Sequence, residues 1–213
     1  WCRMLPDSMK KSFNEDFILL DSHRDLTKEK ITSIDPKYIF FPHWSNIIKE
    51  EIYSHYNCIV FHMTDLPYGR GGSPLQNLIV KGHKKTMISA IKCEAGLDTG
   101  PVYLKKPLNL EGSAKDIFNR STSVIQEMII SIIKNNYKPK PQVGKVVNFK
   151  RRKPSDGDWS KVKSLEEVYN FIRMLDSEDY PSAFVNIGEF KLEFSEAIKS
   201  STTLKATVVI SKS

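Results

Sequence analysis

The sequence predicts an α/β protein with a Rossmann-like, open and mostly parallel sheet, followed by a small mixed α+β subdomain. Two observations carry this prediction. Short continuous apolar runs alternate with helical segments in the first third of the chain, a pattern typical of buried parallel strands joined by crossover helices; the runs are 17–20, 38–41 and 58–61. The composition then changes at 138–141, where alternating Lys and Pro favour an extended linker. We therefore expect a principal domain at 1–140 and a C-terminal subdomain at 141–213.

The elements of the principal domain follow in order. Crossover helices are expected at 25–31 and 45–52, the second with Ser45 as its N-cap. Because a doubly wound sheet normally opens with an apolar strand and 1–14 contains none, the first strand is expected upstream of residue 1, or the sheet is one strand short.

The next segments complete the principal domain. Ser73 followed by Pro74 predicts a helix through Val80, since Pro fits the first helical position. Residues 86–91 indicate a strand, and apolar residues that recur on one face predict the longest helix over 114–133.

The C-terminal subdomain mixes one helix with several strands. An amphipathic pattern predicts a helix over 165–175, and 184–194 indicates a hairpin that turns at Gly188. Residues 204–211 are expected to form the last strand.

Composition narrows the class of protein. The 213 residues include 40% hydrophobic and 27% charged residues, values typical of globular proteins. The net charge of +7 favours anionic partners, but the basic residues are scattered, so nucleic acid is not the expected partner. Three cysteines without a CxxC motif suit a reducing compartment. With no long apolar stretch and no secretory leader pattern, we expect a cytoplasmic protein without membrane contact, and no metal site.

The first candidate site is the segment 61–74, directly after a predicted buried strand. Ligands of open α/β sheets bind outside the strand ends, where His62 would lie, and a histidine can donate or accept a proton near neutral pH. Gly69, Gly71 and Gly72 would allow a ligand to approach the backbone closely. The alternative is that His62 ends a strand and the glycines form a turn.

The second candidate site is the loop 94–100, which also follows a predicted strand. Gly96 and Gly100 bracket Asp98, which we expect to be aimed at a neighbour on the same sheet edge. A carboxylate beside His62 would stabilise the charged imidazolium. The alternative is a turn in which Asp98 bonds only to backbone.

These two segments together resemble the paired signature of the folate-dependent formyltransferases, the family that includes methionyl-tRNA formyltransferase and the sugar N-formyltransferases. The matching residues are His62-Met63-Thr64-Asp65-Leu66-Pro67, Arg70-Gly71, Pro74 and Gly96-Leu97-Asp98-Thr99-Gly100. Their order and separation agree with the family, and the resemblance covers about 38–135.

The resemblance implies the formyltransferase fold and a one-carbon enzyme with 10-formyltetrahydrofolate as cosubstrate. In the family an amine attacks the formyl carbon, the histidine that matches His62 takes the amine proton, and the aspartate that matches Asp98 supports it. The folate-binding loops map onto seven residues: Ser45, Asn46, Ile47, Glu94, Ala95, Gly96 and Leu97.

The sequence departs from the family two residues before His62. The family has an asparagine there, which donates a hydrogen bond to the oxyanion, whereas this chain has Val60. Either His43, Asn46 or Asn77 supplies the donor, or the protein binds folate and a sugar nucleotide with weak or no turnover.

The C-terminal subdomain bears on the acceptor. The segments 149–154 and 180–184 resemble the region after the catalytic domain in sugar N-formyltransferases. Within that class the pseudaminic-acid type is nearest, on the segment 62–78. The acceptor implied is an aminosugar nucleotide used in glycan biosynthesis, bound by Arg70, Gly71, Arg151 and Arg152. Methionyl-tRNA is the alternative acceptor, although the residues after Pro141 are few for a tRNA-binding domain. A homodimer stays open.

Overall fold

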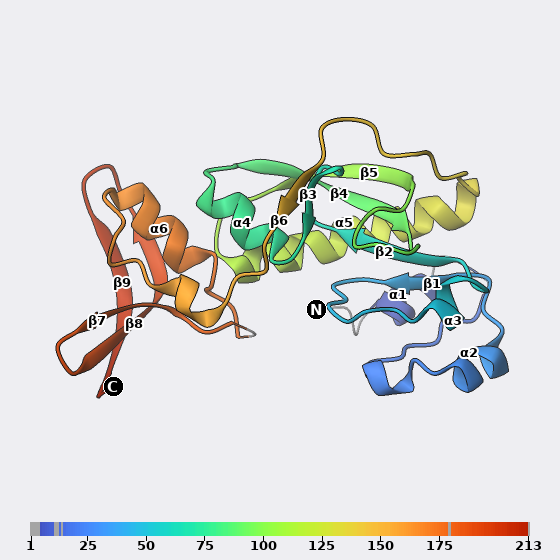
Figure 1. Ribbon diagram of the computed structural model, residues 1–213, viewed down its shortest axis with the longest axis horizontal. Coiled ribbons are helices and arrows are strands. Elements are labelled where there is room, and N and C mark those ends of the chain that lie inside the picture. The colour runs from blue at the N-terminus through green and yellow to red at the C-terminus, as the bar shows by residue number, and fades with distance from the viewer. Residues whose placement is uncertain (1–4, 11–12, 14, 179, 213) are drawn as a thin grey trace. The chain divides into compact units, whose positions relative to one another are not determined.

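The computed structural model describes residues 5–10, 13, 15–178 and 180–212 (Figure 1). The chain divides into two compact units that interleave along the sequence. The first unit comprises Trp1–Arg70, Met87–Leu108 and Asn119–Asn148. The second unit comprises Gly71–Thr86, Asn109–Phe118 and Phe149–Ser213.

The first unit is built on a four-stranded sheet with the order β1-β2-β4-β5. Its strands are β1 (Ile39–Phe41), β2 (Cys58–His62), β4 (Lys85–Lys92) and β5 (Val102–Asn109). Strands β1 and β2 run parallel, whereas β2 and β4 run antiparallel, so the sheet is mixed and not mostly parallel. The predicted α/β class is confirmed. Four of the five β2 residues are buried, which explains why this strand is a continuous apolar run.

Short helices and one long helix accompany this sheet in the chain. They are α1 (Leu5–Lys10), η1 (His23–Asp25), α2 (Lys28–Ile34), α3 (Glu50–Tyr53) and α5 (Ala114–Asn135), the last of which starts in the second unit. Thr27 caps α2, since its hydroxyl accepts the Lys30 N–H at 3.2 Å. Along α5 the predicted apolar stripe is buried, with Ile125, Met128 and Ile132 at most 1% exposed.

Two predicted elements of the first unit are wrong. The run 17–20 belongs to no strand of the described residues, and Ile18 and Leu19 are 59% and 45% exposed, because apolar residues make a strand only where a neighbour pairs with them. The helix expected at 45–52 begins at Glu50 with Lys49 as its N-cap, so Ser45 caps nothing. The chain turns at His43, which has a φ of 51°, and the residues up to Lys49 form a loop.

The described residues of the second unit form two helices besides the start of α5, a short 3-10 turn and an antiparallel sheet. These elements are α4 (Pro74–Val80), η2 (Pro154–Gly157), α6 (Leu165–Arg173), β7 (Ala183–Ile187), β8 (Phe190–Lys199) and β9 (Leu204–Lys212), with the sheet order β7-β8-β9 (Figure 1). The predicted hairpin turn at Gly188 is present, with a φ of 59° that suits glycine. Helix α6 packs against β8.

Two further strands, β3 (Tyr68–Gly71) and β6 (Val147–Phe149), pair with each other. None of the helices in the described part of the chain is long and apolar enough to cross a membrane. Nor do the described His, Cys, Asp and Glu side chains gather in a group of three or more that could hold a metal ion.

Candidate active site

His62 ends strand β2 in the first unit and is 7% exposed. Its Nε2 lies 2.7 Å from the carbonyl oxygen of Gly69, in the glycine-containing segment that follows. The Thr64 hydroxyl donates to the same carbonyl at 3.3 Å. The imidazole ring is therefore packed against the segment that follows β2 and is not exposed to solvent.

Asp98 faces the other ring nitrogen of His62. Its Oδ1 lies 3.5 Å from His62 Nδ1, and the two side chains are only 10% and 8% exposed. A charge on either of two groups with so little exposure is screened less by solvent than a charge at the surface. The two residues that sequence analysis placed at the centre of the site thus lie together in the structure.

The path of the chain to Asp98 differs from the expected one. Because β4 runs antiparallel to β2, its last residue Lys92 lies opposite Ile59, near the start of β2, and not at the edge where His62 lies. The loop after β4 must return along the sheet, and Gly96 and Asp98 adopt φ values of 97° and 55° in doing so. Gly100 is required by close packing, since a Cβ there would lie 1.8 Å from the Lys92 carbonyl oxygen.

The partners of His62 define the proton that the ring carries. A carbonyl oxygen and a carboxylate oxygen only accept hydrogen bonds, so the Gly69 partner requires a proton on Nε2. A proton on Nδ1 as well would complete a favourable contact with Asp98. The arrangement therefore suits an imidazole that gains a proton during a reaction, with the carboxylate in place to stabilise the cation.

Two residues that sequence analysis did not identify fix the loop after His62. Ser89 lies opposite His62 on β4 and is fully buried; its hydroxyl donates to the Thr64 carbonyl at 2.7 Å and accepts the Leu66 N–H at 3.3 Å. Lys105 on β5 contacts the Asp65 carboxylate and the Leu66 carbonyl. One feature of the sequence could have indicated Ser89: it is the only polar residue between Met87 and Ile91 of the predicted strand. No such feature of the sequence indicates Lys105.

The residues predicted to bind folate lie in two exposed loops of the first unit. One loop follows β1, and its Ile47 is 92% exposed. The other follows β4, and its Leu97 is 68% exposed. The remaining members, Ser45, Asn46, Glu94, Ala95 and Gly96, are exposed too. The first loop begins after Phe41, which pairs with Val60 near the end of β2. The second loop begins at Cys93, whose N–H donates to the Cys58 carbonyl at the start of β2. The two loops therefore begin near opposite ends of β2.

The candidates for the missing oxyanion donor differ in their surroundings. His43 lies with Nε2 3.3 Å from the Thr122 hydroxyl, and burial lowers the pKa of its ring to about 4, so it is neutral at pH 7. Asn77 is in the second unit, where its amide donates to the Gly72 and Lys150 carbonyls at 3.0 Å each. Asn46 is exposed in the loop after β1.

The predicted substrate-binding residues separate into different surroundings. Arg70 donates from Nε and Nη2 to Gln142 Oε1, at 3.1 and 2.9 Å, within the first unit. Gly71 belongs to the second unit and has a φ of 106°; a Cβ there would lie 2.4 Å from the Phe149 carbonyl oxygen. Arg151 is exposed and Arg152 is half-buried.

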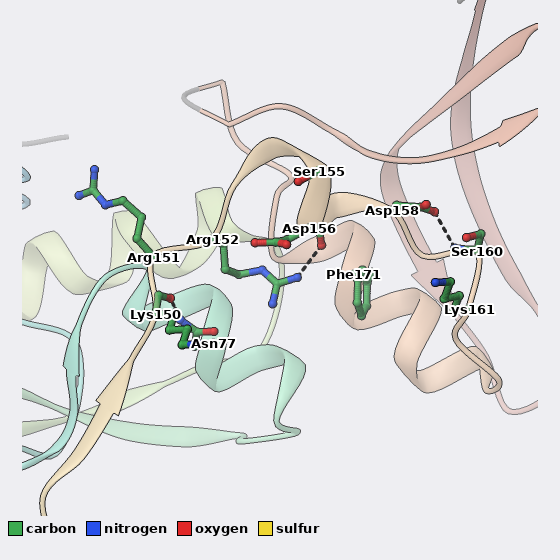
Figure 2. A pocket seen from close by; sticks show the side chains of 10 residues that line it. All are labelled: Asn77, Lys150, Arg151, Arg152, Ser155, Asp156, Asp158, Ser160, Lys161 and Phe171. Carbon is green, nitrogen blue, oxygen red and sulfur yellow. Dashed lines mark hydrogen bonds between the residues drawn. The ribbon is translucent and has the colours of Figure 1, made fainter.

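Arg152 lies in a pocket of about 440 Å³ in the second unit (Figure 2). Its guanidinium lies 5.7 Å from the centre of the Phe171 ring, and burial lowers its pKa. Figure 2 shows the Arg151 side chain pointing away from Arg152. The other lining residues are polar or charged: Asn77, Lys150, Arg151, Ser155, Asp156, Asp158, Ser160 and Lys161. Four cations and two carboxylates give this pocket a positive balance suited to a small anionic ligand.

Comparison with known proteins places this chain in a family. Residues 154–211 match the family model described as "Methionyl-tRNA formyltransferase, C-terminal domain". A solved structure, "Methionyl-tRNA formyltransferase from Clostridium thermocellum", is 44% identical, with a TM-score of 0.93 over 100% of this chain and 93% of that one. The chain belongs to the folate-dependent formyltransferase family.

Other relatives are more distant. The methionyl-tRNA formyltransferase of Thermodesulfovibrio yellowstonii is 29% identical over 68% of this chain and 50% of its own length. This chain spans about half the length of the curated relatives it matches. HypX from Aquifex aeolicus, solved in complex with tetrahydrofolic acid, shares the fold at 19% identity, with a TM-score of 0.74 over 92% of this chain and 35% of that one.

Proposed function

We propose that this protein transfers a formyl group from 10-formyltetrahydrofolate to the amine of an acceptor. The observation that carries the proposal is the nearly buried pair of His62 and Asp98, whose facing atoms lie 3.5 Å apart. A pair of this kind can take up a proton and stabilise the resulting cation away from solvent. Family membership and the preserved order of both motifs support the same reaction.

The proposed reaction balances as an acyl transfer. The acceptor nitrogen attacks the formyl carbon, and the tetrahedral intermediate forms with a new C–N bond. His62 takes the proton that the acceptor nitrogen loses, and Asp98 stabilises the imidazolium. The bond from the formyl carbon to the folate nitrogen then breaks, and that nitrogen receives the proton. For this transfer through Nε2, the acceptor amine replaces the Gly69 carbonyl as the partner of the ring, and the neutral imidazole carries its one proton on Nδ1, facing Asp98, so that Nε2 has a lone pair for the incoming proton.

Two observations support a folate donor. The expected folate loops expose Ile47 and Leu97, apolar side chains that can contact an aromatic ring system. The HypX relative was solved with tetrahydrofolic acid bound. We propose that these loops, with the flanking residues Ser45 and Asn46 and with Glu94 through Gly96, hold the pterin.

For the acceptor we propose an aminosugar nucleotide. The cations of the pocket around Arg152 and Phe171 support a ligand that carries phosphate. The carboxylates of Asp156 and Asp158 in the same wall favour a small ligand. Carboxylates repel a long polyanion but can accept hydrogen bonds from sugar hydroxyls. A solved relative from Helicobacter canadensis, with 15% identity, binds folinic acid and dTDP-3-aminofucose.

Methionyl-tRNA is the second candidate acceptor. The observation that favours it is the match of 154–211 to the C-terminal domain of methionyl-tRNA formyltransferase, together with the names of the curated relatives. Both acceptors present an amine to the same chemistry, so the His62 and Asp98 pair does not separate them.

A mass-spectrometric screen tests the proposal. The protein is incubated with 10-formyltetrahydrofolate and either a panel of aminosugar nucleotides or methionyl-tRNA, and each acceptor is weighed for a gain of one formyl group. We expect the gain on an aminosugar nucleotide. In Arg152→Met we expect the KM for that acceptor to rise, with turnover at saturating acceptor retained. A gain on methionyl-tRNA alone would replace the acceptor, and a gain on neither would contradict the transferase assignment.

A further inference from the structure

A single amide, that of Gln142, joins the two motifs of the candidate active site. Its Nε2 donates to the backbone carbonyls of Asp98 and Gly100, at 2.8 Å each. Its Oε1 accepts from Nε and Nη2 of Arg70, at 3.1 and 2.9 Å. All four residues belong to the first unit, although Gln142 is 42 to 72 residues distant from its partners in sequence.

The chemistry of these partners fixes the orientation of the amide. Carbonyl oxygens only accept and a guanidinium only donates, so the NH₂ group must face Asp98 and Gly100, and the oxygen must face Arg70. Both N–H groups and both lone pairs of the amide are then used. A side chain with four satisfied hydrogen bonds in a half-buried position has one orientation and not several.

The contact matters because Asp98 has an uncommon backbone conformation. Its φ of 55° lies in the left-handed region, which a non-glycine residue keeps only where its surroundings hold it. Gln142 binds the carbonyl of Asp98 itself and that of Gly100, and Gly100 packs too closely on the Lys92 carbonyl to accept a side chain. The backbone on the C-terminal side of Asp98 is therefore held from two directions.

We propose that Gln142 is a positioning residue that holds the Asp98 loop in the conformation in which the carboxylate faces His62. Gln142 does not touch the imidazole or the reacting atoms; it acts through the backbone of Asp98. Gln142 also binds Arg70, which lies eight residues after His62, so the same side chain contacts the backbone of the Asp98 loop and a residue of the segment that follows His62. The consequence for catalysis rests on the proposed function, whereas the effect on the geometry of the His62 and Asp98 pair does not.

The substitution Gln142→Glu separates the two sides of the amide. It keeps an oxygen for Arg70 but presents a second acceptor to the Asp98 and Gly100 carbonyls, so both donated bonds are lost. Gln142→Met, which removes all four bonds without adding charge, is the second variant. Gln126→Glu, the same change on helix α5, controls for an added carboxylate.

The first readout is independent of activity. The ring nitrogen chemical shifts of His62, measured by NMR on ¹⁵N-labelled protein, report its contact with the Asp98 carboxylate, and Asp98→Asn supplies the value without that charge. We expect Gln142→Glu and Gln142→Met to move the shifts toward the Asp98→Asn value, and Gln126→Glu to keep the wild-type value. Wild-type shifts in both Gln142 variants, or in Asp98→Asn itself, would overturn the proposal.

The second readout is a double-mutant cycle on formyl transfer. Gln142→Glu should lower kcat about 10-fold or more with the KM for the folate donor unchanged, and should cause no further loss in the Asp98→Asn background, because it acts through Asp98. Losses that multiply would show a general structural effect and contradict the proposal. If the wild-type protein transfers no formyl group, the proposed function fails while the NMR readout still decides the role of Gln142.

Discussion

At the scale of single residues, Val60 is where this chain departs from its family. Alternate residues of a strand share a face, so Val60 lies on the same face of β2 as His62. It packs against an apolar cluster that contains Phe41, Ile52 and Cys58. The valine thus contributes to a hydrophobic core at the position where the family places an oxyanion donor. The effect of this replacement on the rate of formyl transfer can be measured.

Val60→Asn should raise single-turnover formyl transfer by up to about 100-fold, because its amide can donate to the oxyanion. The free energy of unfolding should fall by about 1 to 3 kcal/mol, since the amide enters an apolar cluster. Val60→Thr is the control of similar volume. If His43 or Asn46 already supplies the donor, Val60→Asn gives no gain, and His43→Ala or Asn46→Ala lowers the rate sharply. No change in any of these variants would contradict both accounts. Asn77 is the weakest substitute, as both its donors are used.

His43 predicts a pH dependence of stability. Burial lowers its pKa to about 4, below the ordinary value of 6.5 expected in the unfolded chain. Between these two values the unfolded state binds the proton and the folded state does not, so stability is lost as pH falls from 6.5 to 4, by roughly 1 kcal/mol per pH unit. His43→Gln should flatten this loss in urea unfolding, and His55→Gln at an exposed position should not. Equal slopes in wild type and His43→Gln would contradict the assignment.

At the scale of elements, Arg173 explains how α6 is joined to the rest of the second unit. The residue is 7% exposed at the last position of the helix. Its Nη1 donates to the Leu110 and Gly112 carbonyls, at 2.6 and 2.9 Å, and its Nε donates to Asn170 Oδ1 at 2.8 Å. One guanidinium therefore satisfies acceptors from two segments that are distant in sequence.

Arg173→Met should lower the free energy of unfolding by roughly 2 to 4 kcal/mol, since it leaves two backbone carbonyls without their partner. Arg151→Met is the matched control, because Arg151 is exposed in the same unit, and it should change stability by less than about 0.5 kcal/mol. Chemical denaturation of both variants checks the difference. Similar stabilities for the two would show that the Arg173 contacts contribute little.

The elements also show what the sequence could and could not predict. Helix α5, the hairpin at Gly188 and the last strand were predicted because their periodicity and turn residues are local signals. The run 17–20 and the helix at 45–52 were wrong, because pairing partners and the turn at His43 depend on tertiary structure. Strand β5 was missed, since Lys105-Lys106-Pro107 interrupts its alternation. His62 and Asp98 were predicted from motifs, and the structure brings them together, whereas Gln142 and Lys105 are recognisable only from their contacts.

At the scale of the whole molecule, the net charge of +7 is compatible with small anionic ligands and with nucleic acid. If the acceptor is a small nucleotide, tRNA should bind only weakly, and moderate salt should abolish the binding, because nonspecific phosphate contacts depend on counterion release. Fluorescence titration of tRNA at several salt concentrations measures this. Tight, salt-resistant and sequence-selective binding would favour methionyl-tRNA as the acceptor.

We propose that His62 and Asp98 together move the proton in formyl transfer. The most direct test is the single-turnover rate of formyl transfer from 10-formyltetrahydrofolate in His62→Gln and Asp98→Asn, each compared with wild type after circular dichroism has shown the same fold. We expect each variant to lose at least about 100-fold in rate, since general acid–base catalysis typically contributes that much. Turnover at the wild-type rate in either folded variant would show that the pair does not move the proton.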